Sequence, residues 1–378
     1  MRRLILAVSV WLAGTAAALA APPTIETPAK HAYMVDVATG TVLLDKDSAV
    51  AMPPASMSKL MTVFMVFERL KKGTLKMDDK LSVSEKAWRT GGSKMFVPIG
   101  GQVAVGDLLR GVIVQSGNDA CVVLAEGLAG SEEAFAEAMT KRAREIGLKE
   151  SVFKNADGLP ADGHVMSARD IATLSLHLIR EFPEFYELFA EKEFQFNGIK
   201  QGNRNPLLYQ NMGADGLKTG HTEASGYGLA ASVKRDGRRV ILVVNGLNSM
   251  KQRWEETARL VNWAYREYDN VILFKKGETV EQADVWLGEQ PKVPLVAARD
   301  VVMTVPRTAK AAIKAAVVYT GPVPAPIAKD APVGEIRVEV PDYPPVSVPL
   351  NAGAEVGKLG PVQRIGSAVR YLLWGASG

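Results

Sequence analysis

Cysteine and histidine are scarce in this chain, and their scarcity argues against two kinds of site. The 378 residues contain one cysteine, Cys121, so an internal disulfide is impossible. Cys121 lies in the apolar run of residues 120–124, which is typical of a small buried side chain. None of the four histidines forms the His-x-x-x-His pair of many zinc sites; they are His31, His164, His177 and His221. We therefore expect neither a metal nor another cofactor.

The chain also lacks any block of like charge. Its formal net charge is +4, and two of the positive charges belong to Arg2 and Arg3 near its start. The rest of the chain is close to neutral and has no basic stripe of the kind that nucleic-acid binding requires. We expect no nucleic-acid partner.

Residues 1–20 are predicted to be a secretory signal peptide. Arg2 and Arg3 supply a positive start, residues 4–19 form an apolar run, and Ala18-Leu19-Ala20 offers the small-x-small cleavage pattern. A membrane-spanning helix is the alternative, but the run is short for the roughly 20 residues that a bilayer requires. Residues 21–30, rich in proline and alanine, are expected to form a linker.

Residues 31–269 are predicted to form one domain of mixed helices and strands. A helix over residues 56–72 should end at Gly73 and be buried on all sides, because only Thr62 is polar between Lys59 and Glu68. The other expected elements of this domain are a hairpin over 32–45, two short helices within 105–128, helices over 131–146 and 168–180, strands over 227–233 and 239–245, and a helix over 252–268.

Residues 270–359 are expected to form a small all-β domain, because short apolar runs alternate there with Pro/Gly turns. Residues 308–316 are the one stretch of it with a weak helical pattern. The last segment, 360–378, carries an apolar stripe over 361–374 with Arg364 and Arg370 alongside. This stripe fits either an amphipathic helix in a membrane interface or a helix docked on its own domain.

Ser56 and Lys59 form the first group of residues that suggests chemistry. On a helix they share one face, and Ser56 would lie at the N-terminal end, where free backbone N–H groups favour negative charge. A serine hydroxyl needs a base to become a nucleophile, and a lysine can be that base if burial lowers its pKa. We therefore predict Ser56 as the nucleophile and Lys59 as its base. The same spacing in Ser151 and Lys154 precedes a polar turn and lacks the buried helix.

Two further motifs follow in order, Ser116-Gly117-Asn118 in a loop and Lys218-Thr219-Gly220 at the start of a strand. Together with Ser-x-x-Lys they form the set found in β-lactamases and penicillin-binding proteins. Ser116 could relay a proton between Lys59 and the leaving group, and Asn118 could hold Lys59 and a substrate amide. Lys218 and Thr219 could bind a substrate carboxylate, and Gly220 would let the substrate backbone pass close to the strand. Backbone N–H groups of Ser56 and His221 could form an oxyanion hole.

On these motifs and their flanks the chain resembles the D-alanyl-D-alanine carboxypeptidases of the low-molecular-mass penicillin-binding protein type. The similar stretches are Pro54 to Thr62, Ser116 to Ala120, Asp215 to Thr222, Asp157 to Pro160, and His164 with Ser167 to Asp170. The match covers residues 30–270 well, and the later β-domain and terminal helix are similar in layout only.

The resemblance implies an α/β (α+β) fold of the β-lactamase/transpeptidase type. An antiparallel sheet and a helical lobe would be followed by a β-sandwich and a C-terminal amphipathic helix. It implies a substrate, the D-Ala-D-Ala end of peptidoglycan stem peptides, and β-lactams as covalent inhibitors of Ser56. It also implies a periplasmic enzyme, on the outer face of the inner membrane if residues 361–374 associate with lipid. By the same comparison Arg253 could assist in binding the substrate carboxylate.

Several other functions remain open on the sequence alone. A serine β-lactamase would use the same motifs but deacylate quickly, and no glutamate can be assigned that task here. An endopeptidase or transpeptidase of the same family differs only in the bond or the acceptor. A cell-wall binding protein without turnover would not need all of these reactive groups.

Overall fold

The computed structural model describes residues 3–6 and 23–361 of the chain. The described residues divide into two compact units, Thr24–Tyr265 and a second unit that contains residues 266–361 together with residues 3–6 and 23. Most of the predicted signal peptide and the predicted amphipathic segment at 361–374 lie outside the described residues. No helix among the described residues has the length and apolar character needed to cross a bilayer.

A five-stranded antiparallel sheet forms the centre of the first unit. Its strand order is β3-β2-β10-β9-β8, so β8 lies at an edge. The strands are β2 (His31–Asp36), β3 (Val42–Lys46), β8 (Ala214–Thr222), β9 (Gly226–Arg235) and β10 (Arg238–Leu247). The β9–β10 hairpin turns at Asp236 and Gly237, both with positive φ, which glycine adopts freely and aspartate tolerates.

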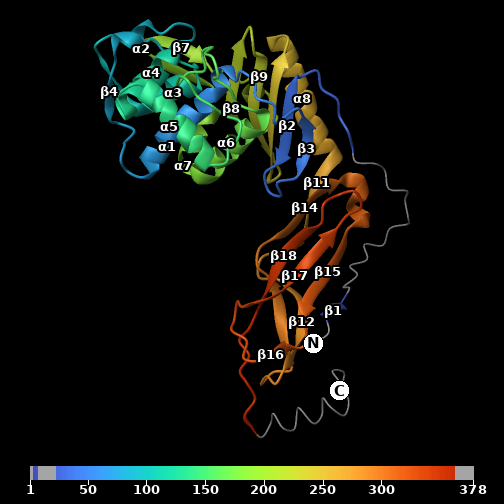
Figure 1. Cartoon of the computed structure of the whole chain (residues 1–378). Coiled ribbons are helices and arrows are strands. Elements are labelled where there is room, and N and C mark those ends of the chain that lie inside the picture. The colour runs from blue at the N-terminus through green and yellow to red at the C-terminus, as the bar shows by residue number, and fades with distance from the viewer. Residues whose placement is uncertain (1–2, 7–22, 362–378) are drawn as a thin grey trace. The chain divides into compact units, whose positions relative to one another are not determined.

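Helices surround this sheet and form a lobe beside it. They are α1 (Lys59–Lys71), α2 (Glu85–Arg89), α3 (Val105–Ile113), α4 (Asn118–Ala129), α5 (Glu132–Glu145), α6 (Ala168–Glu181), α7 (Pro183–Tyr186) and α8 (Met250–Glu267). Figure 1 shows α6 and α8 on opposite sides of the sheet. Short 3-10 turns occur at η1 (Ala55–Ser58), η2 (Glu187–Ala190) and η3 (Pro206–Tyr209), and two small hairpins are β4 (Lys80–Ser82) with β5 (Gln102–Ala104) and β6 (Glu193–Phe196) with β7 (Ile199–Gly202).

The helix boundaries follow local side-chain chemistry. Ser131 and Ser167 cap α5 and α6, because each hydroxyl accepts a hydrogen bond from the N–H group three residues later. Gly73, with φ of +70°, ends the α1 region as the sequence predicts. These caps explain why the helices predicted over 131–146 and 168–180 agree with α5 and α6 to within about two residues, the usual uncertainty of helix ends. The helix predicted from Ser56 instead starts as the 3-10 turn η1, and the α-helix begins only at Lys59.

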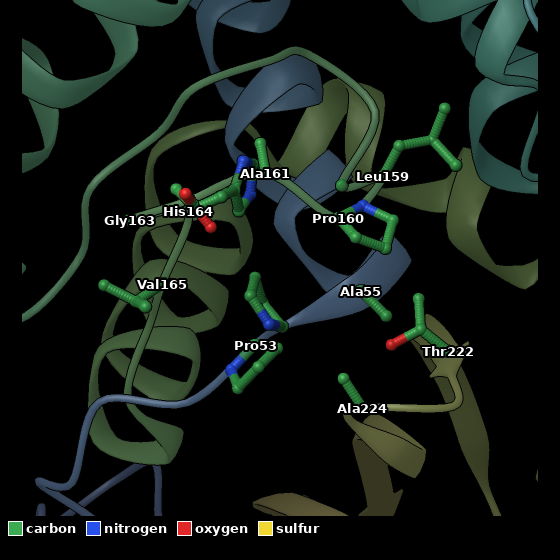
Figure 2. Close-up of a pocket in the computed structure, with 13 residues that line it drawn as sticks. Pro53, Ala55, Leu159, Pro160, Ala161, Gly163, His164, Val165, Thr222 and Ala224 are labelled. Carbon is green, nitrogen blue, oxygen red and sulfur yellow. The ribbon is translucent and has the colours of Figure 1, made fainter.

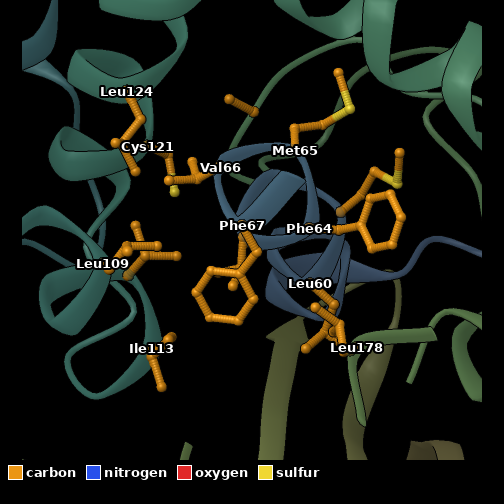
Figure 3. Close-up of a cluster of buried hydrophobic side chains, with 14 of the residues drawn as sticks. Leu60, Phe64, Met65, Val66, Phe67, Leu109, Ile113, Cys121, Leu124 and Leu178 are labelled. Carbon is orange, nitrogen blue, oxygen red and sulfur yellow. The ribbon is translucent and has the colours of Figure 1, made fainter. Parts of the chain in front are cut away.

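Helix α1 lies in the core of the lobe, as its apolar sequence predicts. All residues from Lys59 to Phe67 are buried. Phe64 and Phe67 both contact the ring of Phe182 edge-on, at 5.3 and 5.7 Å between ring centres. Figure 3 shows α1 surrounded by apolar side chains of α3, α4 and α6. A rigid, dry helix therefore carries the predicted base at its first turn.

The second unit is a β-domain with its own hydrophobic core. Its main sheet has the order β1-β15-β17-β18-β13-β12-β16, and β11 pairs with β14 separately. Its strands are β11 (Tyr268–Phe274), β12 (Thr279–Trp286), β13 (Lys292–Ala297), β14 (Val301–Pro306), β15 (Lys314–Thr320), β16 (Val323–Pro324), β17 (Pro332–Glu339) and β18 (Val346–Ala352). No α-helix forms over residues 308–316, where the sequence has a weak helical pattern. This stretch instead contains a 3-10 turn, η4 (Arg307–Ala312), and the start of β15.

Strand β1 (Arg3–Leu6) pairs antiparallel with β15. This strand belongs to the predicted signal peptide, so cleavage of that peptide would leave β15 as an edge strand of the sheet.

Candidate active site

The first residues of the site lie where η1 passes into α1. Lys59 Nζ donates a hydrogen bond to Ser56 Oγ at 2.8 Å, across the i to i+3 spacing that the sequence suggests. Ala55, just before the serine, has a φ of +48°, which is unfavourable for a residue with a Cβ. Such strain often occurs at functional sites, where the surrounding structure holds one strained conformation.

Lys59 is fully buried, with 0% of its surface exposed. Its ammonium donates to Asn118 Oδ1 at 2.8 Å and to the backbone carbonyl oxygen of Asp157. Burial is the main cause that lowers the pKa of Lys59, and the nearby charge of Asp157 offsets part of that effect. A lysine with a lowered pKa, 2.8 Å from a serine hydroxyl, has the geometry and the protonation equilibrium of a general base.

The loop between α3 and α4 supplies the second motif. Ser116 has a φ of +59°, and Asn118 begins α4. The Asn118 side chain joins two parts of the site, because its Oδ1 accepts from Lys59 and its Nδ2 donates to the carbonyl of Gly91 at 2.8 Å. Asp119 holds the loop that contains Gly91, because its carboxylate accepts from three consecutive backbone N–H groups further along that loop, those of Met95, Phe96 and Val97.

Lys218 lies in the middle of the edge strand β8 and not at its start, because β8 begins at Ala214. Its ammonium donates to Ser116 Oγ at 3.0 Å, and only 3% of the residue is exposed. Burial, followed by the positive charge of Lys59, holds the pKa of Lys218 well below its ordinary value. The sequence motifs suggested that Ser116 relays a proton from Lys59, whereas the structure joins the Ser116 hydroxyl to Lys218.

A cleft of about 470 Å³ opens beside these groups. It is lined by Ser56, Ser93, Ser116, Arg204, Thr219, Gly220, His221, Tyr227, Met250 and Arg253. All of the predicted site residues except Lys59, Asn118 and Lys218 therefore line this cleft. Those three are buried, and Lys59 and Lys218 each donate to a serine that lines the cleft, Ser56 and Ser116 respectively.

Arg253 lies in the first turn of α8 but is buried, unlike most arginines at the start of a surface helix. Only 7% of it is exposed, and its guanidinium lies 5.8 Å from the centre of the Tyr227 ring. Its buried Nε has no hydrogen-bond partner among the described residues. Tyr227 in turn stacks on the His221 ring at 3.8 Å. An arginine held in this way presents free N–H donors to an anion in the cleft.

Arg204 lines the same cleft and was not found from the sequence. Its guanidinium donates to Ser93 Oγ at 2.6 Å, which directs it into the cleft from the loop after β7. It stands in a polar turn, Gly202-Asn203-Arg204-Asn205, where the sequence carries no signal that separates a ligand-binding arginine from a solvated one. With Arg253, it brings two guanidinium groups to this side of the cleft, which makes it cationic.

The fold and the site together define a serine hydrolase of the penicillin-recognising type, in which a helix serine, a buried lysine and a Lys-Thr-Gly strand meet. The sequence profile of the D-alanyl-D-alanine carboxypeptidase family matches residues 16–249, and that of the penicillin-binding protein 5 C-terminal domain matches residues 268–358. The chain belongs to this family of serine carboxypeptidases.

Relatives agree over most of the chain. The D-alanyl-D-alanine carboxypeptidase DacA of Escherichia coli is 38% identical, over 84% of this chain and 81% of the relative. The crystal structure of penicillin binding protein 5 from Haemophilus influenzae has a TM-score of 0.81 and 34% identity, and the match covers 89% of this chain and 99% of that one. The family, the serine D-Ala-D-Ala carboxypeptidase activity and the predicted fold class, apart from its C-terminal helix, are therefore confirmed.

A second solved structure bears on β-lactams. Penicillin-Binding Protein D2 from Listeria monocytogenes, solved in an ampicillin-bound form, is 31% identical with a TM-score of 0.58, over 64% of this chain and 98% of that one.

Proposed function

We propose that Ser56 is the acylated residue and that Lys59 is the base that activates it. The observation that carries this proposal is the contact of 2.8 Å between Ser56 Oγ and the fully buried Lys59 Nζ. Neutral Lys59 takes the hydroxyl proton while Ser56 Oγ attacks the carbonyl carbon of the D-Ala-D-Ala bond. The backbone N–H groups of Ser56 and His221 stabilise the oxyanion of the tetrahedral intermediate.

A proton then reaches the nitrogen of the leaving D-alanine through Ser116 and Lys218. Ser116 Oγ lines the cleft and accepts from Lys218, so the hydroxyl can donate its own proton to the departing nitrogen and regain one from the ammonium. The C–N bond breaks and free D-alanine leaves. Lys59 then gives up the proton that it took from Ser56 and Lys218 regains one, which restores both groups. Water attacks the ester of Ser56, Lys59 takes the proton of that water, and Ser56 Oγ receives this proton as the shortened peptide leaves.

The cationic side of the cleft selects the substrate. The free carboxylate of the terminal D-alanine fits the Thr219 hydroxyl and the guanidinium groups of Arg253 and Arg204, all of which line the cleft. Bidentate guanidinium–carboxylate pairs hold the scissile bond in one orientation. The requirement for a free carboxylate favours carboxypeptidase action over endopeptidase action. In an internal peptide bond, the residue after the scissile bond carries no free carboxylate for the two guanidinium groups to bind.

β-Lactams enter the same scheme as slow substrates. Their ring amide stands in for the scissile bond and their carboxylate for that of D-alanine, so Ser56 opens the ring and retains the acyl group. The ampicillin-bound relative supports this proposal.

Mass spectrometry of the intact protein after penicillin treatment tests the assignment. We expect a mass increase equal to one penicillin, localised by digestion to the peptide that contains Ser56, and no adduct in Ser56→Ala. Ser151→Ala is the matched control, since Ser151 has the same spacing to Lys154 but hydrogen-bonds to Asp170 in the interior. An adduct retained in Ser56→Ala would contradict the proposal.

We further propose that the enzyme is exported to the periplasm and associates with the outer face of the inner membrane. The leader at residues 1–20 and the apolar stripe at 361–374 support this. Fractionation of cells that express the full chain or a chain truncated before Pro361 tests it. The full chain is expected with membranes and the truncated chain in the soluble periplasmic fraction; equal distribution of both would reject the anchor.

A further inference from the structure

Met250, the first residue of α8, lines the active-site cleft together with Ser56 and Arg253. Its side chain is 66% exposed, so a small solute in the surrounding water can reach its sulfur. The reaction scheme proposed above gives this residue no task. Because Met250 is accessible and lines the cleft that holds the substrate, a chemical change of its side chain would affect the reaction.

The other sulfur atoms of the described residues are much less accessible. Of the 13 methionines of the chain, ten are at most 9% exposed, and Met77 is partly exposed. Figure 3 shows Met65, for example, among the buried apolar side chains around α1. Cys121 is buried as well, and burial raises the pKa of its thiol, so the reactive thiolate does not form at neutral pH. A dissolved oxidant should therefore react first at Met250.

Arg253 makes an oxidation at this position consequential. It lies three residues after Met250, on the same face of α8, and its buried Nε has no hydrogen-bond partner among the described residues. The thioether sulfur of a methionine is a weak acceptor, so Met250 leaves the Arg253 donors free for the substrate carboxylate. Oxidation to the sulfoxide would place a polar oxygen one helical turn from this guanidinium.

The effect should be confined to the carboxylate end of the site. A neighbouring cavity of about 350 Å³ has mainly apolar walls, and no methionine or cysteine is among the described residues that line it. Figure 2 shows some of these residues, including Pro53, Leu159, Pro160 and Val165. An oxidant therefore finds no sulfur there, and we expect the binding of the substrate carboxylate to change.

We propose that Met250 is a reversible oxidation site that controls binding of the substrate carboxylate. Hydrogen peroxide oxidises the thioether sulfur by two electrons: one peroxide oxygen bonds to the sulfur, the O–O bond breaks, and water leaves. The sulfoxide oxygen then accepts from the Arg253 guanidinium and competes with the carboxylate of the terminal D-alanine. Methionine sulfoxide reductases reverse the step with a dithiol, which becomes a disulfide while the oxygen leaves as water. The proposal rests on the proposed function, because that function places the substrate carboxylate at Arg253.

Limited oxidation with hydrogen peroxide, followed by peptide mapping and kinetics, tests the proposal. The peptide that contains Met250 should gain one oxygen atom before any other methionine-containing peptide of the described residues. KM for a diacetyl-lysyl-D-Ala-D-Ala peptide should rise with the fraction of Met250 oxidised, by about tenfold at completion, the usual effect of losing a hydrogen bond to a charged group. Methionine sulfoxide reductases specific for each of the two sulfoxide epimers, supplied with dithiothreitol, should restore the original KM.

Variants assign the effect to this one side chain. Met250→Leu should keep its own KM through the same treatment, because leucine has a similar volume and no sulfur. Met77→Leu is the matched control, since Met77 is partly exposed but lines neither cavity, and it should respond to peroxide as the unmodified enzyme does. Met250→Gln places an amide oxygen near the position of the sulfoxide oxygen and should raise KM without any oxidant.

Three results would overturn the proposal: oxidation of another described methionine before Met250, an unchanged KM after complete oxidation of Met250, or the same response to peroxide in Met250→Leu as in the unmodified enzyme. Hydrolysis by the untreated enzyme and a penicillin adduct on Ser56 would still support the proposed function in each of these cases. No hydrolysis and no adduct in the untreated enzyme would overturn both.

Discussion

Replacement of Asn118 by aspartate should shift the acylation reaction to higher pH without removing it. Asn118 Oδ1 accepts from Lys59 Nζ at 2.8 Å, so a carboxylate of the same shape would place a full negative charge against the ammonium. An opposite charge at this distance raises a lysine pKa by roughly 1–3 units. The surroundings are dry, so solvent screening would be weak.

The expected magnitude follows from the neutral fraction of Lys59. Acylation needs the neutral amine, and each unit by which its pKa rises lowers that fraction tenfold at a pH below the pKa. Asn118→Asp should therefore lower the second-order rate constant for penicillin acylation at pH 7 by about 10- to 1,000-fold. The rate should recover as the pH rises toward the new pKa.

Stopped-flow acylation with a fluorescent penicillin from pH 6 to pH 11 measures this shift. Asn262→Asp is the control for added charge, since Asn262 is an exposed carboxamide on α8 that accepts from Arg235. Its profile should match that of the unmodified enzyme. A profile for Asn118→Asp with an unchanged midpoint and only a lower plateau would refute Lys59 as the titrating base and assign Asn118 a purely geometric role.

Three further changes have clear expected outcomes. Arg253→Gln should raise KM for D-Ala-D-Ala peptides by about tenfold, because a buried charge-assisted hydrogen bond to the carboxylate is lost; unchanged steady-state constants would remove Arg253 from the carboxylate site. Gly158→Ala should destabilise the first unit by roughly 2–5 kcal/mol, since φ is +81° and the added Cβ would overlap with the Ala55 carbonyl oxygen; an unchanged thermal midpoint would contradict this packing. Asp119→Asn should lower the midpoint of thermal unfolding and slow acylation, because one of its acceptor oxygens becomes an N–H donor beside backbone N–H groups; an unchanged melting curve would show that the loop is fixed by other contacts.

The sequence was sufficient for features that depend on local chemistry. Helix caps, the glycine after α1 and the burial of α1 all follow from residue types at fixed spacing. The Ser56–Lys59 pair is of this kind, because one helical turn alone brings the two side chains together.

Contacts between distant segments could not be predicted in the same way. Ser116 and Lys218 are 102 residues apart, and no spacing rule states which of two ammonium groups the hydroxyl meets. Arg253 was assigned to the substrate site only by resemblance, because its burial depends on Tyr227 of another element, whose ring lies 5.8 Å from the guanidinium. Arg204 carries no sequence signal at all, since its role depends on the direction in which Ser93 holds it.

The two buried lysines also explain why a substrate carboxylate should affect chemistry as well as binding. The charge of Lys59 is one cause that lowers the pKa of Lys218, so the two ammonium groups disfavour each other in a site with little water. A carboxylate bound near Thr219 would stabilise the charged form of Lys218 and, through the same repulsion, favour neutral Lys59. A peptide that ends in D-alanine amide should therefore show a lower kcat as well as a higher KM, and its pH profile should lie at higher pH. If the amide changes KM alone, the two lysines titrate independently and this coupling does not exist.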